Sequence, residues 1–394
     1  MHHSLMLKAN SIALFLTRPV PWVAAMVLLA VGCARSTQVW SRVSGPKYGE
    51  QTIAARQRYF GSENVAPDGS VRRDRVILSW TGVSSFAAAF GGHVVLLDGW
   101  IARGNPCFPS GVPCPAIWNH NMAYVGSTDT ELANLVPTAY FFGHSHFDHA
   151  GDLPTVVRAN PAMRLFGTQE HCDDIKAEVS AAQCVAVFSA AAEIGAVAEL
   201  PAGTLPGVGV TAVKQPHSGA GGDDGRFTWQ GECAPIADYP VDLIEPRSWA
   251  GLTSGYISIA WQLRVGDFAV TWQDTAGPIR SGPGLSYKAL DGQVYDGAPI
   301  TAALERLPQT DVRLGAVVVS GKSVTIDHLR ALRFPKVFIP LHGDPCFARS
   351  RAEIQQYIDE KLAPTERPRL RLLADPADYL TPIVFDPAAP EWRE

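Results

Sequence analysis

The sequence predicts an α/β protein, because strand-like and helix-like segments alternate in both halves of the chain. Residues 138–142 form an apolar run typical of a buried strand, and residues 152–160, with Asp152 as the expected N-cap, are typical of a helix. In the second half, the helix-like residues 325–332 precede the strand-like residues 335–341. Alternation of this kind is typical of layered α/β folds.

The remaining elements follow from apolar periodicity and from Gly and Pro punctuation. A hairpin is expected where Gly91 and Gly92 separate two short apolar runs. Strands are expected at residues 75–80, 85–90, 93–97, 164–166, 185–188, 207–214, 256–264, 268–273, 314–319 and 369–373. Further helices are expected at residues 50–60, 168–183 and 352–362.

The composition is that of a globular protein with a large core. The chain has 394 residues, of which 46% are hydrophobic and 18% are charged, so one large domain or two ordinary ones would fit. The formal net charge of −5 gives no bulk attraction to nucleic acid or to an anionic membrane surface. We therefore expect no nucleic-acid partner.

The N-terminus resembles a bacterial export signal. Basic residues precede an apolar run at residues 19–31, which is shorter than the roughly 20 residues that span a bilayer. Residues 30–33 resemble a lipobox, in which Cys33 would become the lipidated first residue of the mature protein. The alternative is ordinary cleavage nearby, with Cys33 unmodified. Either way, we expect an exported protein, located in the periplasm or held in the cell envelope as a lipoprotein.

The domain organisation follows from these segments. Residues 1–33 are the expected signal peptide, and residues 34–74 are an expected tether with a covering helix. The main domain is expected at residues 75–350, and residues 351–394 are its C-terminal helix and tail.

Six cysteines besides Cys33 agree with an oxidising compartment, where an even number suggests disulfides. Cys107 and Cys114 bracket a short loop and form the easiest pair, and Cys172 and Cys184 flank a helix-like stretch and could also pair. Cys233 and Cys346 would then remain for each other, although six cysteines allow 15 connectivities. Buried thiols are the alternative.

The most informative stretch is residues 143–151, between the strand at 138–142 and the following helix. It places His144, His146, Asp148 and His149 within six positions. Neutral imidazoles and a carboxylate are good ligands for zinc, iron or manganese. Residues two apart project the same way from extended chain, so a turn at His149 would make two groups of ligands, which suits two metals.

Other polar residues also follow predicted strands. Asp98 ends the strand at 93–97 and is either a simple strand-ending Asp or, as a family resemblance implies, an acid behind the histidine turn. His217, Asp274 and His342 each end a later strand, whereas His328 lies within a helix-like stretch and is expected to be structural. The loops at 100–125, which includes His120, and at 219–250 are expected to select the substrate, the second as a lid.

The motif H-x-H-x-D-H after a strand, with later His, Asp and His at strand ends, resembles the metallo-β-lactamase fold superfamily over residues 75–345. The stretch around His217 is closest to the branch that holds ascorbate-phosphate lactonase and the phospholipase D acting on N-acylphosphatidylethanolamine. The resemblance implies a four-layer αββα sandwich. Many relatives have Gly-Asp-Thr where this chain has Gln273-Asp274-Thr275, so a different local backbone is expected there.

The resemblance also implies the roles of the seven residues. One metal would be held by His144, His146 and His217, and the other by Asp148, His149 and His342, with Asp274 bridging the two. The metals would be two divalent ions, zinc with manganese or iron as alternatives. A water between them would be the nucleophile, and Asp148 would orient it or take up a proton.

We therefore expect an exported dinuclear metallo-hydrolase. Its substrate would be a small or lipid-like molecule with a phosphodiester, or with a lactone or other ester. The alternative is a surface lipoprotein of the same fold that binds a metal or ligand without turnover. A third alternative is a structural disulfide-rich module. Neither the substrate nor the oligomeric state follows from the sequence.

Overall fold

The computed structural model describes residues 48–100, 128–217, 257–275, 287–288, 294–317, 322–341, 347–373, 378 and 380–389. The expected signal peptide with Cys33, the loop at 101–127 and the insertion at 219–250 lie outside these residues. Internal contacts divide the chain into residues 1–44 and 45–394, and every described residue belongs to the second unit. In the part that the structure describes, no helix is both long and apolar enough to cross a membrane.

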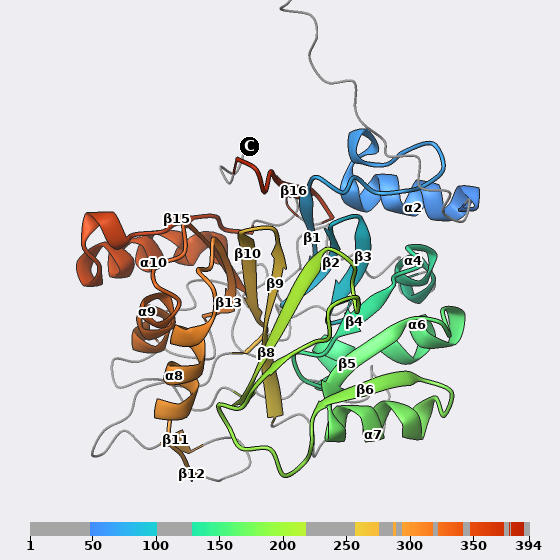
Figure 1. The fold of residues 1–394 in the computed structure, drawn as a ribbon. Coiled ribbons are helices and arrows are strands. Elements are labelled where there is room, and N and C mark those ends of the chain that lie inside the picture. Colours follow the sequence, from blue (N-terminus) through green and yellow to red (C-terminus); the bar gives the residue numbers. More distant parts are fainter. Residues whose placement is uncertain are drawn as a thin grey trace, which may run out of the picture. The chain divides into compact units, whose positions relative to one another are not determined.

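Two seven-stranded mixed sheets form the centre of the described unit (Figure 1). The first has the order β16 (Pro382–Phe385), β1 (Val76–Gly82), β2 (Ser85–Phe90), β3 (His93–Leu97), β4 (Ala139–Phe141), β5 (Arg164–Thr168) and β6 (Gln183–Phe188). The second has the order β15 (Arg369–Leu370), β14 (Val337–Leu341), β13 (Val312–Ala316), β10 (Phe268–Gln273), β9 (Ile257–Val265), β8 (Val208–Pro216) and β7 (Val197–Glu199). A separate hairpin pairs β11 (Tyr287–Lys288) with β12 (Val294–Tyr295).

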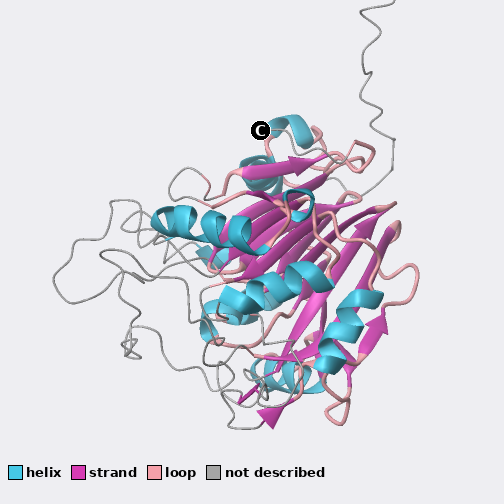
Figure 2. Ribbon diagram, turned by 90° about the vertical axis from the view of Figure 1, so that its left-hand side faces the viewer, coloured by secondary structure: helices cyan, strands magenta, loops and turns pink. Residues whose placement is uncertain are grey.

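Helices cover the outer face of each sheet. The first sheet is covered by α2 (Glu50–Phe60), α4 (Thr128–Asn134), α6 (Leu153–Ala159) and α7 (Gln169–Glu178). The second is covered by α8 (Ala298–Arg306), α9 (Lys322–Ala331) and α10 (Phe347–Lys361). Figure 2 looks from the side of these three helices and shows helices lying in front of the strands.

The layers follow from the two-residue period of the strands. On β1, Val76, Leu78 and Trp80 enter the core between the sheets, whereas Ile77 packs against the helix side. Trp261 and Trp272 of the second sheet enter the same central core and are fully buried. The molecule therefore has the order helix, sheet, sheet, helix, and the predicted α/β fold class with four layers is confirmed.

Strand direction brings distant segments to one edge. β3, β4, β5 and β6 run parallel, so the residues after β3 and β4 emerge side by side. In the second sheet, β8 and β10 both pair antiparallel with β9, so these two strands also end at a common edge. This edge holds Asp98, the histidine turn, His217 and Asp274.

Several predicted elements differ in detail from the structure. The strand expected at 314–319 is β13, which begins two residues earlier, and the tail contains β16, which pairs with β1 and was not predicted. Asp152 occupies the N-cap position of α6, but its side chain makes no capping hydrogen bond. The predicted N-cap position of Asp152 is therefore confirmed.

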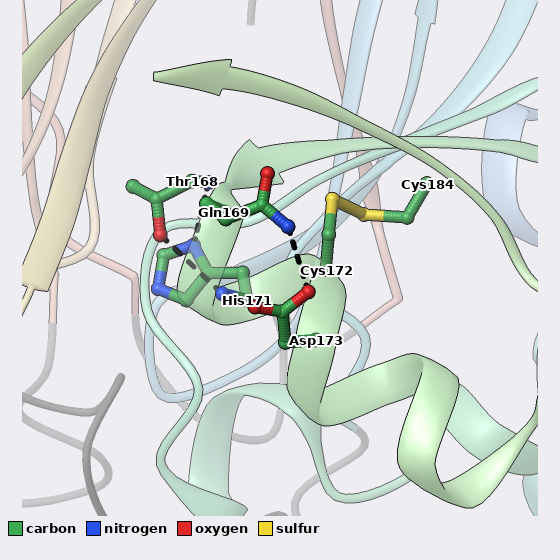
Figure 3. Close-up of a disulfide and its surroundings, with 6 residues drawn as sticks. All are labelled: Thr168, Gln169, His171, Cys172, Asp173 and Cys184. Carbon is green, nitrogen blue, oxygen red and sulfur yellow. Dashed lines mark hydrogen bonds between the residues drawn. A yellow bond between two sulfur atoms is a disulfide. The ribbon is translucent and has the colours of Figure 1, made fainter. Parts of the chain in front are cut away.

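One predicted disulfide is present. Cys172 on α7 and Cys184 on β6 are bonded, with their Cα atoms 5.3 Å apart, which joins the helix to the edge strand (Figure 3). The start of α7 is also fixed, because Thr168 Oγ1 accepts from His171 N and Thr168 N donates to His171 Nδ1. The pairs proposed for Cys107 with Cys114 and for Cys233 with Cys346 lie outside the described residues.

Candidate metal centre

The turn after β4 brings three histidines into one small volume. Strand β4 ends at Phe141, and the short helix α5 (Phe147–Ala150) begins directly after His146. The N–H groups of His149 and Ala150 both donate to His146 O, at 3.0 and 2.9 Å. This tight turn rotates His149 back towards His144, and the two ring centroids lie 3.9 Å apart.

His144, His146 and His217 form the first group of potential ligands. Each offers a ligand atom within 4.8 Å of the others, and His144 Nε2 lies 3.0 Å from His146 Nδ1. His217 comes from the residue after β8, and its ring centroid is 4.6 Å from His144 and 4.8 Å from His146. These are the three residues that the resemblance assigns to one metal.

His144, His149 and Asp274 form the second group, and all three are fully buried. Asp274 follows β10, and its Oδ2 contacts His144 Nδ1 closely and lies 3.6 Å from His149 Nδ1. Asp274 therefore stands between the two histidines, and His144 takes part in both groups. The family resemblance assigns the bridging role to Asp274.

Asp98 holds the histidine turn from behind. Its Oδ1 accepts from Gly143 N at 2.8 Å, and its Oδ2 lies 2.8 Å from His149 Nδ1. An ionised carboxylate can only accept, so an ionised Asp98 favours the His149 tautomer that has its proton on Nδ1 and its lone pair on Nε2. Asp98 has a φ of 53°, a left-handed conformation that Asp tolerates better than most residues. Of the two interpretations, the structure supports an acid behind the turn.

Gly143 allows Asp274 to approach the histidine turn. A Cβ atom at this position would collide with the Asp274 carboxylate, so any larger residue would displace it. The two sheets are also joined here, because Ile259 N donates to Gly143 O at 2.9 Å and Ser84 Oγ donates to Asp274 O at 2.9 Å. The approach of the two ligand groups is thus built into the contact between the sheets.

The site concentrates negative charge in a buried place. Asp98 and Asp274 have exposed fractions of 1% and 0%. Burial raises the pKa of Tyr140 well above its ordinary value, and the charges of these two carboxylates raise it further, so the Tyr140 phenol stays neutral. Asp98 contacts the ring of His149, and Asp274 contacts the rings of His144 and His149. A histidine ring binds a metal ion through a nitrogen lone pair, which it keeps only when it is neutral.

The donor set fits a divalent transition metal. Zinc, iron and manganese sites use imidazole nitrogens and carboxylate oxygens as ligands, and both are clustered here. Such sites also use a second carboxylate that hydrogen-bonds a ligand histidine, as Asp98 does here. The residues present therefore fit the implied metals.

Two expected ligands are not tested by the structure. His342 lies outside the described residues, and only the backbone of Asp148 is described, within α5. His328 was expected to be structural and is fully buried in α9, with Nδ1 2.9 Å from Val324 O. His120 lies outside the described residues.

Some residues of the site were missed by the sequence analysis. Ser84 and Ser258 both hold Asp274, and Gln215 contacts Ser258. The sequence did contain a signal for Ser258, which is a polar residue between Ile257 and Ile259 in an otherwise apolar strand. A hydroxyl buried in this way needs a hydrogen-bond partner. Gln273, where a backbone different from that of Gly-Asp-Thr relatives is expected, keeps regular strand pairing with Gly315.

Comparison with known proteins gives partial likenesses. No family model matches the sequence. A "UPF0173 metal-dependent hydrolase" of Polynucleobacter asymbioticus is 25% identical over 168 residues, which cover 42% of this chain and 50% of that protein. The match therefore spans half the length of this curated relative.

Several solved structures share part of the architecture at low identity. Igni18, a metallo hydrolase from Ignicoccus hospitalis, is 15% identical with a TM-score of 0.45, over 79% of this chain and 98% of that one. The diiron β-hydroxylase CmlA from Streptomyces venezuelae is 11% identical with a TM-score of 0.42, over 77% and 54%. Yeast PDE1 is 12% identical with a TM-score of 0.40, over 75% and 96%. The chain is thus similar, over part of its sequence, to a protein named as a metal-dependent hydrolase.

Proposed function

We propose that this protein is a metal-dependent hydrolase with a dinuclear centre, and that zinc is its metal. The observation that carries this proposal is the convergence of His144, His146 and His217 with His149 and Asp274 at one edge of the two sheets. Three separate strand ends, those of β4, β8 and β10, supply these side chains. A set of buried imidazoles and carboxylates on strand ends has little structural purpose without a cation, because burying such groups is costly.

Each residue has a distinct task in this proposal. One ion would be held by His144, His146 and His217, and the other by Asp148, His149 and His342. Asp274 would bind both. When bound, such metals supply a nucleophile from water at neutral pH and polarise the carbonyl or phosphoryl oxygen of the substrate. Asp98 keeps the Nδ1 proton of His149 in place, so that Nε2 presents its lone pair. Asp148 would orient the attacking water or take up a proton.

The substrate is proposed to be a phosphodiester or a lactone or other ester on a small or lipid-like molecule. The sequence around His217 resembles the branch that acts on such substrates, and an oxygen ligand at Asp274 differs from the thiolate of many β-lactam-cleaving relatives. The net charge of −5 does not favour a polyanionic nucleic acid.

Metal analysis and one variant test the proposal. The purified protein should contain close to two equivalents of metal and should hydrolyse a member of a panel of chromogenic phosphodiesters, lactones and esters. His146→Ala should abolish turnover and lower the metal content while the protein stays folded. The matched control is His93→Ala, because His93 lies at the start of β3, at the opposite end of that strand from Asp98. Full turnover in His146→Ala would refute the proposal, and metal binding without turnover on any substrate would favour the non-catalytic binding protein.

We also propose that the protein is exported and attached to a membrane through a lipid on Cys33. The apolar segment at 19–31, the lipobox-like residues 30–33 and the Cys172–Cys184 disulfide support this, because disulfides persist in oxidising compartments. Wild-type protein expressed in a bacterium should fractionate with membranes and incorporate labelled palmitate. Cys33→Ala should be released and unlabelled, and an unlabelled wild-type protein would exclude the lipid anchor.

A further inference from the structure

The two oxygens of Asp274 have different partners. Oδ1 accepts from Ser258 Oγ at 2.9 Å and from Thr275 N at 2.6 Å. Oδ2 is the oxygen that contacts His144 Nδ1 and lies 3.6 Å from His149 Nδ1. The carboxylate is therefore turned so that Oδ2 faces the candidate ligands and Oδ1 faces its own sheet.

The direction of the Ser258 hydrogen bond is set by a chain of side-chain amides. The carbonyl of Thr275 can only accept, so the group of Gln215 that lies 2.8 Å from it must be the Nε2 amide. The same Nε2 lies 3.3 Å from Ser258 Oγ and donates to it. Since Ser258 accepts from Gln215, its single hydroxyl proton is directed to Asp274.

Gln273 completes this chain from the neighbouring strand. Its Nε2 donates to Gln215 Oε1 at 3.0 Å, which holds the Gln215 amide in the required orientation. Gln215, Ser258, Gln273 and Asp274 all have exposed fractions of 0%, so water does not compete with these bonds.

We propose that Ser258, oriented by Gln215 and Gln273, is a positioning residue that makes Asp274 offer Oδ2 alone to the metal centre. This inference rests on the proposed function. If the Asp274 carboxylate could rotate, both of its oxygens could bind the same ion. The second ion would then be held weakly. Oδ1 accepts from two donors, the Ser258 hydroxyl and a backbone N–H. Rotation of the carboxylate would leave these buried donors without an acceptor, so rotation is disfavoured.

Metal affinity measured separately from turnover tests this inference. In a competitive chelator titration, Ser258→Ala should bind the more weakly held ion about 10- to 100-fold less tightly, the range found when groups behind metal ligands are removed. The visible spectrum of the cobalt-substituted protein should change with this variant, because the oxygen coordination of the ion changes. Ser258→Thr, which keeps the hydroxyl, should restore both readouts. Gln215→Met, which leaves Ser258 in place without its orienting donor, should give a smaller loss in the same direction.

The matched control removes a similar buried hydroxyl that does not contact Asp274. Thr271 lies on the same face of β10 as Gln273, and its Oγ1 lies 2.7 Å from Thr310 Oγ1. Thr271→Val should leave metal affinity and the cobalt spectrum unchanged. Melting of the metal-depleted proteins shows that each variant is folded.

Wild-type affinity and an unchanged cobalt spectrum in Ser258→Ala would overturn the inference. Failure of the proposed function would give a different result from failure of this inference alone. If the protein has no metal centre at these residues, His146→Ala would also keep the wild-type metal content in the same titration.

Discussion

His149 Nδ1 and Asp98 Oδ2 lie 2.8 Å apart, and both side chains are buried from solvent. The same carboxylate also accepts from the backbone of Gly143. One side chain after β3 therefore holds both the backbone and a ligand ring of the turn after β4. This contact between neighbouring parallel strands orients the second group of ligands.

Asp98→Asn should weaken metal binding while preserving shape. The amide oxygen of the new side chain can still accept from Gly143 N, so its NH₂ group faces His149 Nδ1. Two donors would then face each other, because His149 needs its proton on Nδ1 to keep the lone pair on Nε2. We expect about 10- to 100-fold weaker metal binding in a chelator titration. Asp311→Asn is the matched control, because Asp311 is also buried and accepts from a backbone N–H, of Ala269, away from the site. Equal affinity losses in both variants would contradict the assigned role of Asp98.

Gly143→Ala should disrupt the site through contact with Asp274. The added methyl group would meet the buried carboxylate, which has to move away from the histidines. We expect loss of most bound metal and a fall in the free energy of unfolding of about 1–3 kcal/mol, the range for overpacked cores. Metal analysis and urea unfolding measure the two effects. Gly49→Ala, where an added Cβ meets nothing within 4 Å, should change neither.

Two buried arginines should respond in opposite ways to the same substitution. Arg56 donates to the carbonyl oxygens of Leu135, Gly69 and Val136, at 2.9, 2.9 and 3.2 Å. Arg313 is fully buried and donates to Thr325 O at 3.3 Å, while its Nε and Nη2 have no hydrogen-bond partner among the residues that the structure describes. Burial accordingly lowers the pKa of Arg313 to about 9.

We expect Arg313→Met to raise the free energy of unfolding by about 1–4 kcal/mol, because a flexible apolar side chain replaces a poorly compensated charge. Arg56→Met should lower it by about 1–3 kcal/mol, because buried carbonyl groups lose their donors. Urea unfolding of the metal-depleted proteins measures both. A loss of stability in Arg313→Met as large as that in Arg56→Met would show that the Arg313 charge is compensated.

His328 should make the protein less stable in acid. Burial lowers its pKa well below the ordinary 6.5, and the charge of Arg313 adds to this effect. Below pH 6.5 the unfolded chain takes up a proton that the folded protein does not, so this contribution to stability is present above that pH and is lost as the pH falls. The loss is at most about 1.4 kcal/mol per pH unit.

We therefore expect the stability of the wild type relative to His328→Gln to fall between pH 6.5 and 5. Urea unfolding at several pH values, with chelator present in every sample, isolates this residue because all other histidines are shared. A difference that does not change with pH would argue against a neutral His328.

The amino-acid sequence determined much of the architecture on local grounds. Apolar runs of four to nine residues and the Gly91-Gly92 turn predicted most strands, because strand periodicity and turn chemistry depend on neighbours in the chain. Strand β16 was missed because its partner, β1, lies about 300 residues away, and a short half-buried segment has no distinctive pattern of its own. The histidine turn and the later strand ends were likewise visible as motifs.

The tertiary structure alone decided how those ends meet. Nothing local pairs Ser84 with Asp274, which are 190 positions apart, or places Asp274 against Gly143, where a missing Cβ makes room. The direction of the hydrogen bonds from Gln273 through Gln215 to Ser258 likewise depends on strands β8, β9 and β10 lying side by side. Periodicity specifies which face of an element is buried, but hydrogen-bond direction and close approach depend on partners that only folding brings within reach.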